Sequence, residues 1–169
     1  MGRLVMKFGG TSVADIERIR NVARHVEREV KAGNHVAVVV SAMAGTTNQL
    51  VEWCRQAAAV HDAREYDAIV STGEQITAGL LALVLQDMGI PARSWSGWQI
   101  PIETDGVHGA ARMTAINGAE ILKRMEQGQV AVITGFQGIG PDKRVSTLGR
   151  GGSDTSAVAV AAALEAACD

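Results

Sequence analysis

Hydrophobic positions along the chain change their spacing several times, and these changes predict strands that alternate with helices. Val36–Val40 is a near-continuous β-branched run, which is typical of a strand buried on both faces. Similar short runs over 4–8, 92–96 and 130–134 predict three further strands. One helix face is indicated by apolar side chains spaced by three and four residues, at Ile16, Ile19, Ala23, Val26 and Val30.

The remaining pattern predicts four more helices and two segments without clear periodicity. We expect helices over 47–60, 65–88, 117–127 and 154–167, the second of them broken or bent around Ser71-Thr72-Gly73. Short strands and turns are expected over 100–113, and 135–152 reads as one long glycine-rich connection.

Strands separated by helices imply right-handed crossovers and a mostly parallel sheet with helices on both faces. The sequence therefore predicts an α/β fold, a three-layer αβα sandwich. Its 169 residues suit one such domain. The predicted helix over 154–167 is not followed by another strand, although the βαβ rhythm asks for one, so we expect the domain to be incomplete.

Composition narrows the classes of function. Lys and Arg number 16 against 18 Asp and Glu, and this net charge of −2 speaks against a nucleic-acid or membrane-surface partner. No uninterrupted apolar run approaches the roughly 18 residues of a membrane span. Cys54 and Cys168 lie far apart, and no metal-ligand spacing is visible, so we expect a cytoplasmic protein without a resident metal.

Two glycine-rich segments are candidates for phosphate binding. Lys7-Phe8-Gly9-Gly10-Thr11-Ser12 joins a predicted strand to a helix, so that backbone N–H groups, a helix N-terminus and a cation converge. Gly149–Asp154 also precedes a helix. Taken singly, the first reads equally as a plain turn and the second as a loop ending in an Asp cap. Both follow predicted strands, so we expect them to meet at the carboxyl edge of the sheet, where ligands bind.

Three other segments offer weaker signals. Gly73 interrupts a helical pattern, and a glycine is unfavourable in a helix. Its presence is explained by close approach of a ligand or, more commonly, by tight helix packing. Glu74 is interpreted either as the acceptor of a substrate ammonium or as a solvated side chain. In the small-residue loop 41–48, hydroxyl groups either reach a ligand or cap the next helix. His108, between two glycines, is expected to structure its loop by hydrogen bonding.

Six segments in order resemble the amino-terminal part of the aspartokinase family, within the amino acid kinase superfamily and its carbamate-kinase-like fold. They are KFGGTSV (7–13), VVVSAMAGTTN (38–48), STGE (71–74), HGAAR (108–112), TGFQG (134–138) and TLGRGGSDTSA (147–157). The resemblance implies transfer of the γ-phosphoryl group of ATP, with Mg²⁺, to the β-carboxylate of L-aspartate, giving 4-phospho-L-aspartate. This is the first step towards lysine, threonine, methionine and isoleucine.

The resemblance also assigns roles to individual residues. Lys7 and Asp154 are implied as catalytic residues: Lys7 stabilises the transferring phosphoryl group, and Asp154 orients Lys7. The implied ATP phosphate contacts are Lys7, Phe8, Gly9, Gly10, Ser12 and Ser41. The implied aspartate contacts are Ser41, Thr47, Glu74, Phe136, Arg150 and Ser153.

Departures from the family pattern are of two kinds. Ser146 stands where the family usually has Thr, and Ala110 where a lysine often follows His-Gly. Family members also continue with a nucleotide pocket and ACT regulatory domains, so we expect residues 1–169 to be the amino-terminal half of the kinase domain, inactive or weakly active alone. It would form a homo-oligomer or associate with the missing half. Two alternatives stay open: a non-catalytic binding or assembly module that pairs with a separate chain, and a phosphate-binding domain with another acceptor.

Overall fold

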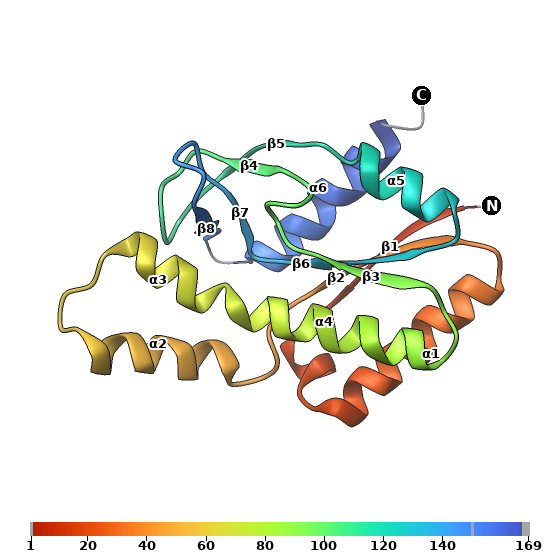
Figure 1. Cartoon of the computed structure of the whole chain (residues 1–169), viewed down its shortest axis with the longest axis horizontal. Helices are drawn as coiled ribbons and strands as arrows, with labels where there is room; N and C mark the ends of the chain where they lie inside the picture. The colour runs from red at the N-terminus through yellow and green to blue at the C-terminus, as the bar shows by residue number, and fades with distance from the viewer. Residues whose placement is uncertain (1, 150, 167–169) are drawn as a thin grey trace.

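A parallel four-stranded sheet forms the centre of the computed structural model, which describes residues 2–149 and 151–166 (Figure 1). The strand order is β1-β2-β6-β3. The strands span Arg3–Phe8 (β1), His35–Val40 (β2), Ala92–Trp95 (β3) and Val130–Thr134 (β6). All four strands predicted from the sequence are present, and their carboxyl ends share one edge because every pairing in this sheet is parallel.

Helices cover both faces of this sheet. Helices α1 (Ile16–Lys31) and α4 (Thr72–Asp87) pack on one face, while α5 (Ala119–Glu126) and α6 (Gly152–Ala166) pack on the other. Strand β2 serves both cores, since Val38 and Val40 face α1 and α4, whereas Ala37 and Val39 face α5 and α6. The predicted three-layer αβα arrangement is confirmed.

Two more helices extend to one side of the sheet (Figure 1). They are α2 (Thr46–Ala57) and α3 (Ala63–Val70), and Ser71 separates α3 from α4, as the predicted bend requires. By length and composition alone, Ala63–Asp87 passes as a membrane-spanning stretch, although half of its most apolar window is buried in the protein, as in a core helix.

A second, smaller sheet lies above the first and has the order β5-β4-β7-β8. Its strands span Ile102–Thr104 (β4), Met113–Ile116 (β5), Gln137–Ile139 (β7) and Val145–Thr147 (β8). The expectation of one long connection over 135–152 was therefore wrong. Strands of three residues are too short to show alternation, and Gly138 packs against the backbone of Ile102 so closely that no side chain would fit.

Candidate active site at the carboxyl edge of the sheet

Lys7 and Asp154 meet at this edge, although they lie near opposite ends of the chain. Lys7 is the penultimate residue of β1, and its Nζ is 2.7 Å from Oδ1 of Asp154. The lysine side chain is 29% exposed and the aspartate 71%. We expected a helix that starts at Asp154, but α6 begins at Gly152. Asp154 therefore lies in the first turn of the helix, from which it pairs with Lys7. The predicted meeting of the two glycine-rich segments is confirmed.

The turn after β1 brings backbone close to the neighbouring loop. Gly10 opens a short 3-10 helix, η1 (Gly10–Val13), and a side chain here would lie 3.0 Å from the carbonyl oxygen of Ala42. At Gly9, a side chain would face Nζ of Lys7 at 3.3 Å. Phe8 packs against the core on the α1–α4 face, so its backbone is the part that belongs to the turn. Gly9 therefore leaves room beside Nζ of Lys7, and Gly10 lets the turn approach the loop that follows β2.

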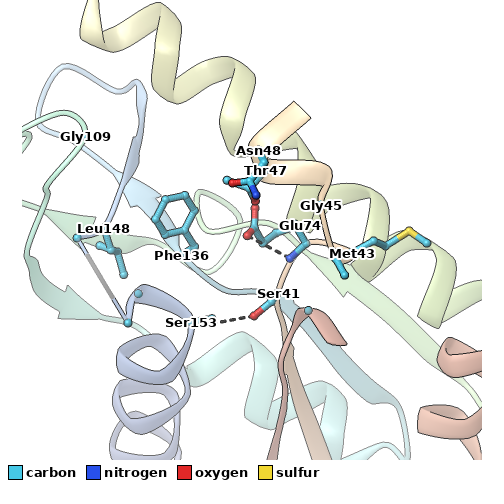
Figure 2. A pocket seen from close by; sticks show the side chains of 16 residues that line it. Ser41, Met43, Gly45, Thr47, Asn48, Glu74, Gly109, Phe136, Leu148 and Ser153 are labelled. Atoms are coloured by element: carbon cyan, nitrogen blue, oxygen red, sulfur yellow. Dashed lines mark hydrogen bonds between the residues drawn. The ribbon is translucent and has the colours of Figure 1, made fainter. Parts of the chain in front are cut away.

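A cavity of about 510 Å³ opens beside this turn (Figure 2). Six of the predicted site residues line it, namely Gly10, Ser41, Thr47, Glu74, Phe136 and Ser153. Of the other predicted site residues, Lys7, Phe8, Gly9, Ser12 and Asp154 are outside its lining. Arg150 lies outside the described residues. Lys7 and Asp154 thus lie beside the cavity, because Gly10 follows Lys7 by three residues, Ser153 directly precedes Asp154, and both Gly10 and Ser153 line it.

Ser41 and Ser153 join the loop after β2 to the first turn of α6. The Ser41 hydroxyl donates a hydrogen bond of 2.8 Å to Oγ of Ser153 (Figure 2). Gly135 makes this approach possible, because a side chain at that position would lie 2.8 Å from Cβ of Ser153. Both hydroxyl groups therefore lie in the cavity wall on two separate elements.

Glu74 places a buried carboxyl group in the wall. Its side chain is only 4% exposed, and Oε1 accepts a hydrogen bond of 3.2 Å from the backbone N–H of Ala42. Oε2 is buried and has no partner among the described residues. Burial raises the pKa of Glu74 to about 7, although the backbone hydrogen bonds work against the rise. The reading of Glu74 as a solvated side chain is wrong.

Gly73 owes its presence to packing, the commoner of the two explanations that the sequence left open. A side chain at this position would lie 2.8 Å from Cβ of Ala42 and 3.4 Å from Cγ2 of Thr46. Helix α4 thereby begins directly against the loop that follows β2, and this contact brings Glu74 to the backbone N–H of Ala42.

Phe136 lies across the cavity from Glu74 and Thr47 (Figure 2). Its backbone is left-handed, with φ 70°, and its N–H donates a hydrogen bond of 3.1 Å to Oγ of Ser156 in α6. A side chain at Gly152 would lie 2.8 Å from the Phe136 ring. The ring therefore packs closely against the start of α6.

Sequence reasoning missed several lining residues. Asn48 and Met43 belong to the small-residue loop and to the family segment 38–48, but no role was assigned to them. Gly109, Leu148 and Gly149 form a further part of the wall, and of these only Gly149 stood in a candidate phosphate-binding segment. His108 does structure its loop as predicted, since its ring nitrogens lie 2.8 Å from Asp67 and 3.1 Å from Asp142. Within the described ranges, no group of three or more His, Cys, Asp or Glu side chains is arranged to hold a metal.

An αβα domain with a lysine–carboxylate pair and glycine-rich turns at the carboxyl edge of its sheet has the architecture of a phosphate-handling enzyme. The chain belongs to the amino acid kinase family, whose model matches residues 2–168.

Curated relatives place it near one branch of that family. It is 51% identical over 170 residues to an aspartokinase of Bacillus sp. (strain MGA3) and 46% identical over 170 residues to aspartokinase 2 of Bacillus subtilis (strain 168). Each alignment covers 100% of this chain but 41% and 42% of those relatives. The chain thus spans about two fifths of the length of these relatives.

Solved structures agree in fold. The aspartate kinase of Synechocystis aligns with a TM-score of 0.81 at 43% identity, covering 98% of this chain and 27% of that one. Aspartokinase III of E. coli, in complex with aspartate and ADP, aligns with a TM-score of 0.83 at 25% identity, covering 98% of this chain and 47% of that one.

Proposed function

We propose that residues 1–169 are the amino-terminal, amino-acid- and phosphate-binding half of an aspartate kinase domain. The reaction transfers the γ-phosphoryl group of ATP to the β-carboxylate of L-aspartate and gives 4-phospho-L-aspartate, in the cytoplasmic synthesis of lysine, threonine, methionine and isoleucine. One observation carries the proposal: the Lys7–Asp154 pair stands beside a cavity whose wall contains a buried carboxyl group. The identity to named aspartokinases supports the choice of substrate.

Glu74 is the proposed acceptor of the substrate ammonium. A buried carboxylate oxygen without a partner is unfavourable in the free protein, and an ammonium group supplies both a charge and hydrogen bonds. Thr47 and Ser153 offer hydroxyl groups to the same ligand, and Phe136 offers an apolar surface. Arg150 would pair with a substrate carboxylate by its planar guanidinium.

Lys7 is the proposed electrostatic catalyst. The β-carboxylate of aspartate is already ionised at neutral pH, so it attacks the γ-phosphorus without a general base. The bond to the bridging oxygen breaks, and ADP leaves. The difficulty is the approach of two anions, which a cation beside the transferring oxygens relieves. Asp154 holds Nζ of Lys7 in place, while Gly9, Gly10, Ser12, Ser41 and the backbone of Phe8 would cradle the phosphates.

The nucleotide substrate is proposed to be MgATP. Asp154 is engaged with Lys7, and no carboxylate cage for a cation exists among the described side chains. The ion would then be held chiefly by phosphate oxygens, as is usual for Mg²⁺ at nucleotides.

Calorimetry with L-aspartate and with succinate tests the proposed substrate. Succinate has both carboxylates but no ammonium, so only L-aspartate should gain from Glu74. We expect weak binding of L-aspartate, at least tenfold weaker binding of succinate, and little or no turnover with MgATP. In the Glu74→Gln variant, the two ligands should bind alike. Equal affinities in the unchanged protein would refute the assignment of Glu74.

A second candidate, an assembly module that pairs with another chain, is favoured by the open edge of β1. Among the described residues, β1 pairs only with β2. Helix α6 lies on the same face as α5, and the crossover that contains α5 runs from β3 to β6. A right-handed crossover through α6 therefore continues in the same direction, past β2, to the β1 edge. Solution mass on mixing with the carboxyl-terminal segment of a longer relative tests this, and a monomer with no gain in mass contradicts it.

A further inference from the structure

Asp67 is a buried acid that the proposed reaction does not use. It lies on α3, its side chain has no exposure, and both carboxylate oxygens accept hydrogen bonds. Oδ2 accepts from Nδ1 of His108 at 2.8 Å and from the backbone N–H groups of Gly109 and Thr147, each at 3.0 Å. Oδ1 accepts from the Thr147 hydroxyl. A carboxylate buried without exposure is tolerated only when it is satisfied in this way.

The donors to Asp67 come from two segments that form one wall of the cavity. Gly109 itself lines the cavity, and Thr147 directly precedes Leu148 and Gly149, which also line it. The segments are joined to each other as well, since the N–H of Ala111 donates a hydrogen bond of 2.9 Å to the Thr147 carbonyl. A single side chain on α3 thus fixes this wall of the cavity.

His108 adds a titratable connection to the surface. Its ring is 8% exposed, and Nε2 lies 3.1 Å from Asp142, in the turn between β7 and β8. Only the imidazolium form donates from both ring nitrogens. Burial lowers the pKa of His108, but the hydrogen bonds with Asp142 and Asp67 outweigh it, so the pKa is raised above its usual 6.5.

Two other ion pairs involve residues next to this cluster. On α3, Glu65 pairs with Arg144 of the β7–β8 hairpin, and Arg64 pairs with Asp62. The groups in contact with the His108 ring are therefore two carboxylates, Asp67 from α3 and Asp142 from the hairpin.

We propose that Asp67 and His108 are positioning residues of the cavity: together they hold Gly109, Leu148 and Gly149 in place, and the charge of His108 sets how firmly they are held. The identity of the ligand rests on the function proposed above, but the connection between His108 and the wall does not. The wall is firm while His108 is protonated and loosens when the ring loses one of its two donors.

NMR of the free protein tests the connection without any ligand. The Cε1 proton of His108 and the backbone amides of Gly109, Leu148 and Gly149 should titrate with one midpoint above 6.5. Asp142→Asn should lower that midpoint, and His61→Gln, which removes an exposed histidine elsewhere, should leave it unchanged. The same titration in a Glu74→Gln background excludes Glu74 as its source. Wall amides that do not follow His108 would overturn the proposal.

Binding of L-aspartate supplies the second test. Thr147→Val should weaken binding about tenfold, whereas Thr147→Ser, which keeps the hydroxyl donor, should restore it. His108→Gln should weaken binding severalfold at pH 6 and remove the pH dependence that follows His108. Equal affinity of the valine and serine variants, both folded by circular dichroism, refutes the positioning role. If the unchanged protein binds no L-aspartate while the NMR coupling is present, the proposed function fails and the positioning of the wall stands.

Discussion

Glu74 shows how a single side chain sets function against stability. An acid in a site that is 4% exposed holds its proton more tightly than it does in water, and its pKa rises to about 7. The described part of the fold supplies no hydrogen-bond partner for the buried Oε2 of this side chain. A cationic ligand would supply what is missing, so the site is less stable when empty than when filled.

The raised pKa of Glu74 makes stability depend on pH in a defined direction. The folded-state pKa of about 7 lies above the unfolded value of 4.5, so its stabilising contribution is complete below 4.5 and is lost as the pH rises through 7. The loss amounts to roughly 3 kcal/mol. Glu74→Gln should therefore gain stability relative to the unchanged protein between pH 5 and 8. Urea unfolding at both pH values measures this, and a constant difference between the two proteins would contradict it.

The same pKa predicts proton release on binding. When an ammonium group pairs with Glu74, its pKa falls, so about half a proton should leave at pH 7 and almost none at pH 9. Calorimetry of L-aspartate binding in buffers of different ionisation enthalpy counts the proton. In Glu74→Gln, this proton release should disappear, and any buffer dependence that remains should come from proton uptake by His108.

Lys7 and Asp154 should matter more for ligand binding than for folding. The pair is 2.7 Å apart, but Asp154 is 71% exposed, and exposed ion pairs contribute about 1 kcal/mol or less. We expect Lys7→Met and Asp154→Asn each to change the free energy of unfolding by less than about 1 kcal/mol. Lys7→Met should nevertheless lose most of the affinity for MgATP. Guanidinium unfolding and calorimetry give the two values. A large loss of stability with unchanged MgATP affinity would reverse the assignment.

At the residue scale, the sequence identifies polar groups that belong to a short local motif. It does not identify polar groups that stand out only because the fold buries them. Lys7, Ser41 and Ser153 lie close to glycines or other small residues, which indicate a turn in the sequence. Asp67 looks like any acid on an amphipathic helix, because its donors, His108 and Thr147, come from distant segments. No pattern in one sequence indicates such a meeting.

At the scale of the elements, α4 illustrates what periodicity shows and what it hides. The break before it was predictable from Ser71-Thr72-Gly73, and its apolar run from hydropathy. The main-sheet strands were equally visible, since buried parallel strands read as continuous apolar runs. Strands β7 and β8 were not, because three residues carry too little alternation to separate them from a loop.

Two glycines in α4 form a matched pair for testing helix packing. At Gly73 a methyl group would meet Cβ of Ala42 at 2.8 Å, whereas at Gly79 it would meet nothing within 4 Å. Gly73→Ala should destabilise the protein by about 1–3 kcal/mol and displace the loop that carries Ser41. Gly79→Ala should stabilise it by up to about 1 kcal/mol, because alanine favours helix. Thermal unfolding of both variants decides, and an equal effect of the two would show that the contact with Ala42 is unimportant.

At the scale of the whole molecule, the right-handed course of the chain defines where a further strand belongs. The handedness of the crossovers directs any strand after α6 to the edge of β1, which bonds only β2 among the described strands. The sequence predicted that a strand is missing from the domain, but not which edge of the sheet it would join. Its position depends on the strand order, which a single sequence does not encode in its periodicity.

Amide hydrogen exchange tests this placement. The amides of β1 should exchange faster than those of β2 and β6, which have neighbours on both sides. Adding the carboxyl-terminal segment of an aspartokinase such as that of Bacillus subtilis should protect β1 and leave β3 unchanged. Protection that appears at β3 instead would contradict the handedness argument.

The pairing of β1 with the first turn of α6 also has a consequence for synthesis on the ribosome. Lys7 leaves the exit tunnel long before Asp154 and Ser153, which follow nearly every other described residue. A nascent chain can therefore arrange most of its central sheet while its ligand cleft still lacks one side. At the proposed site, ligand capture would begin only when translation has passed α6, so a ligand would not assist the earlier stages of folding through this cleft.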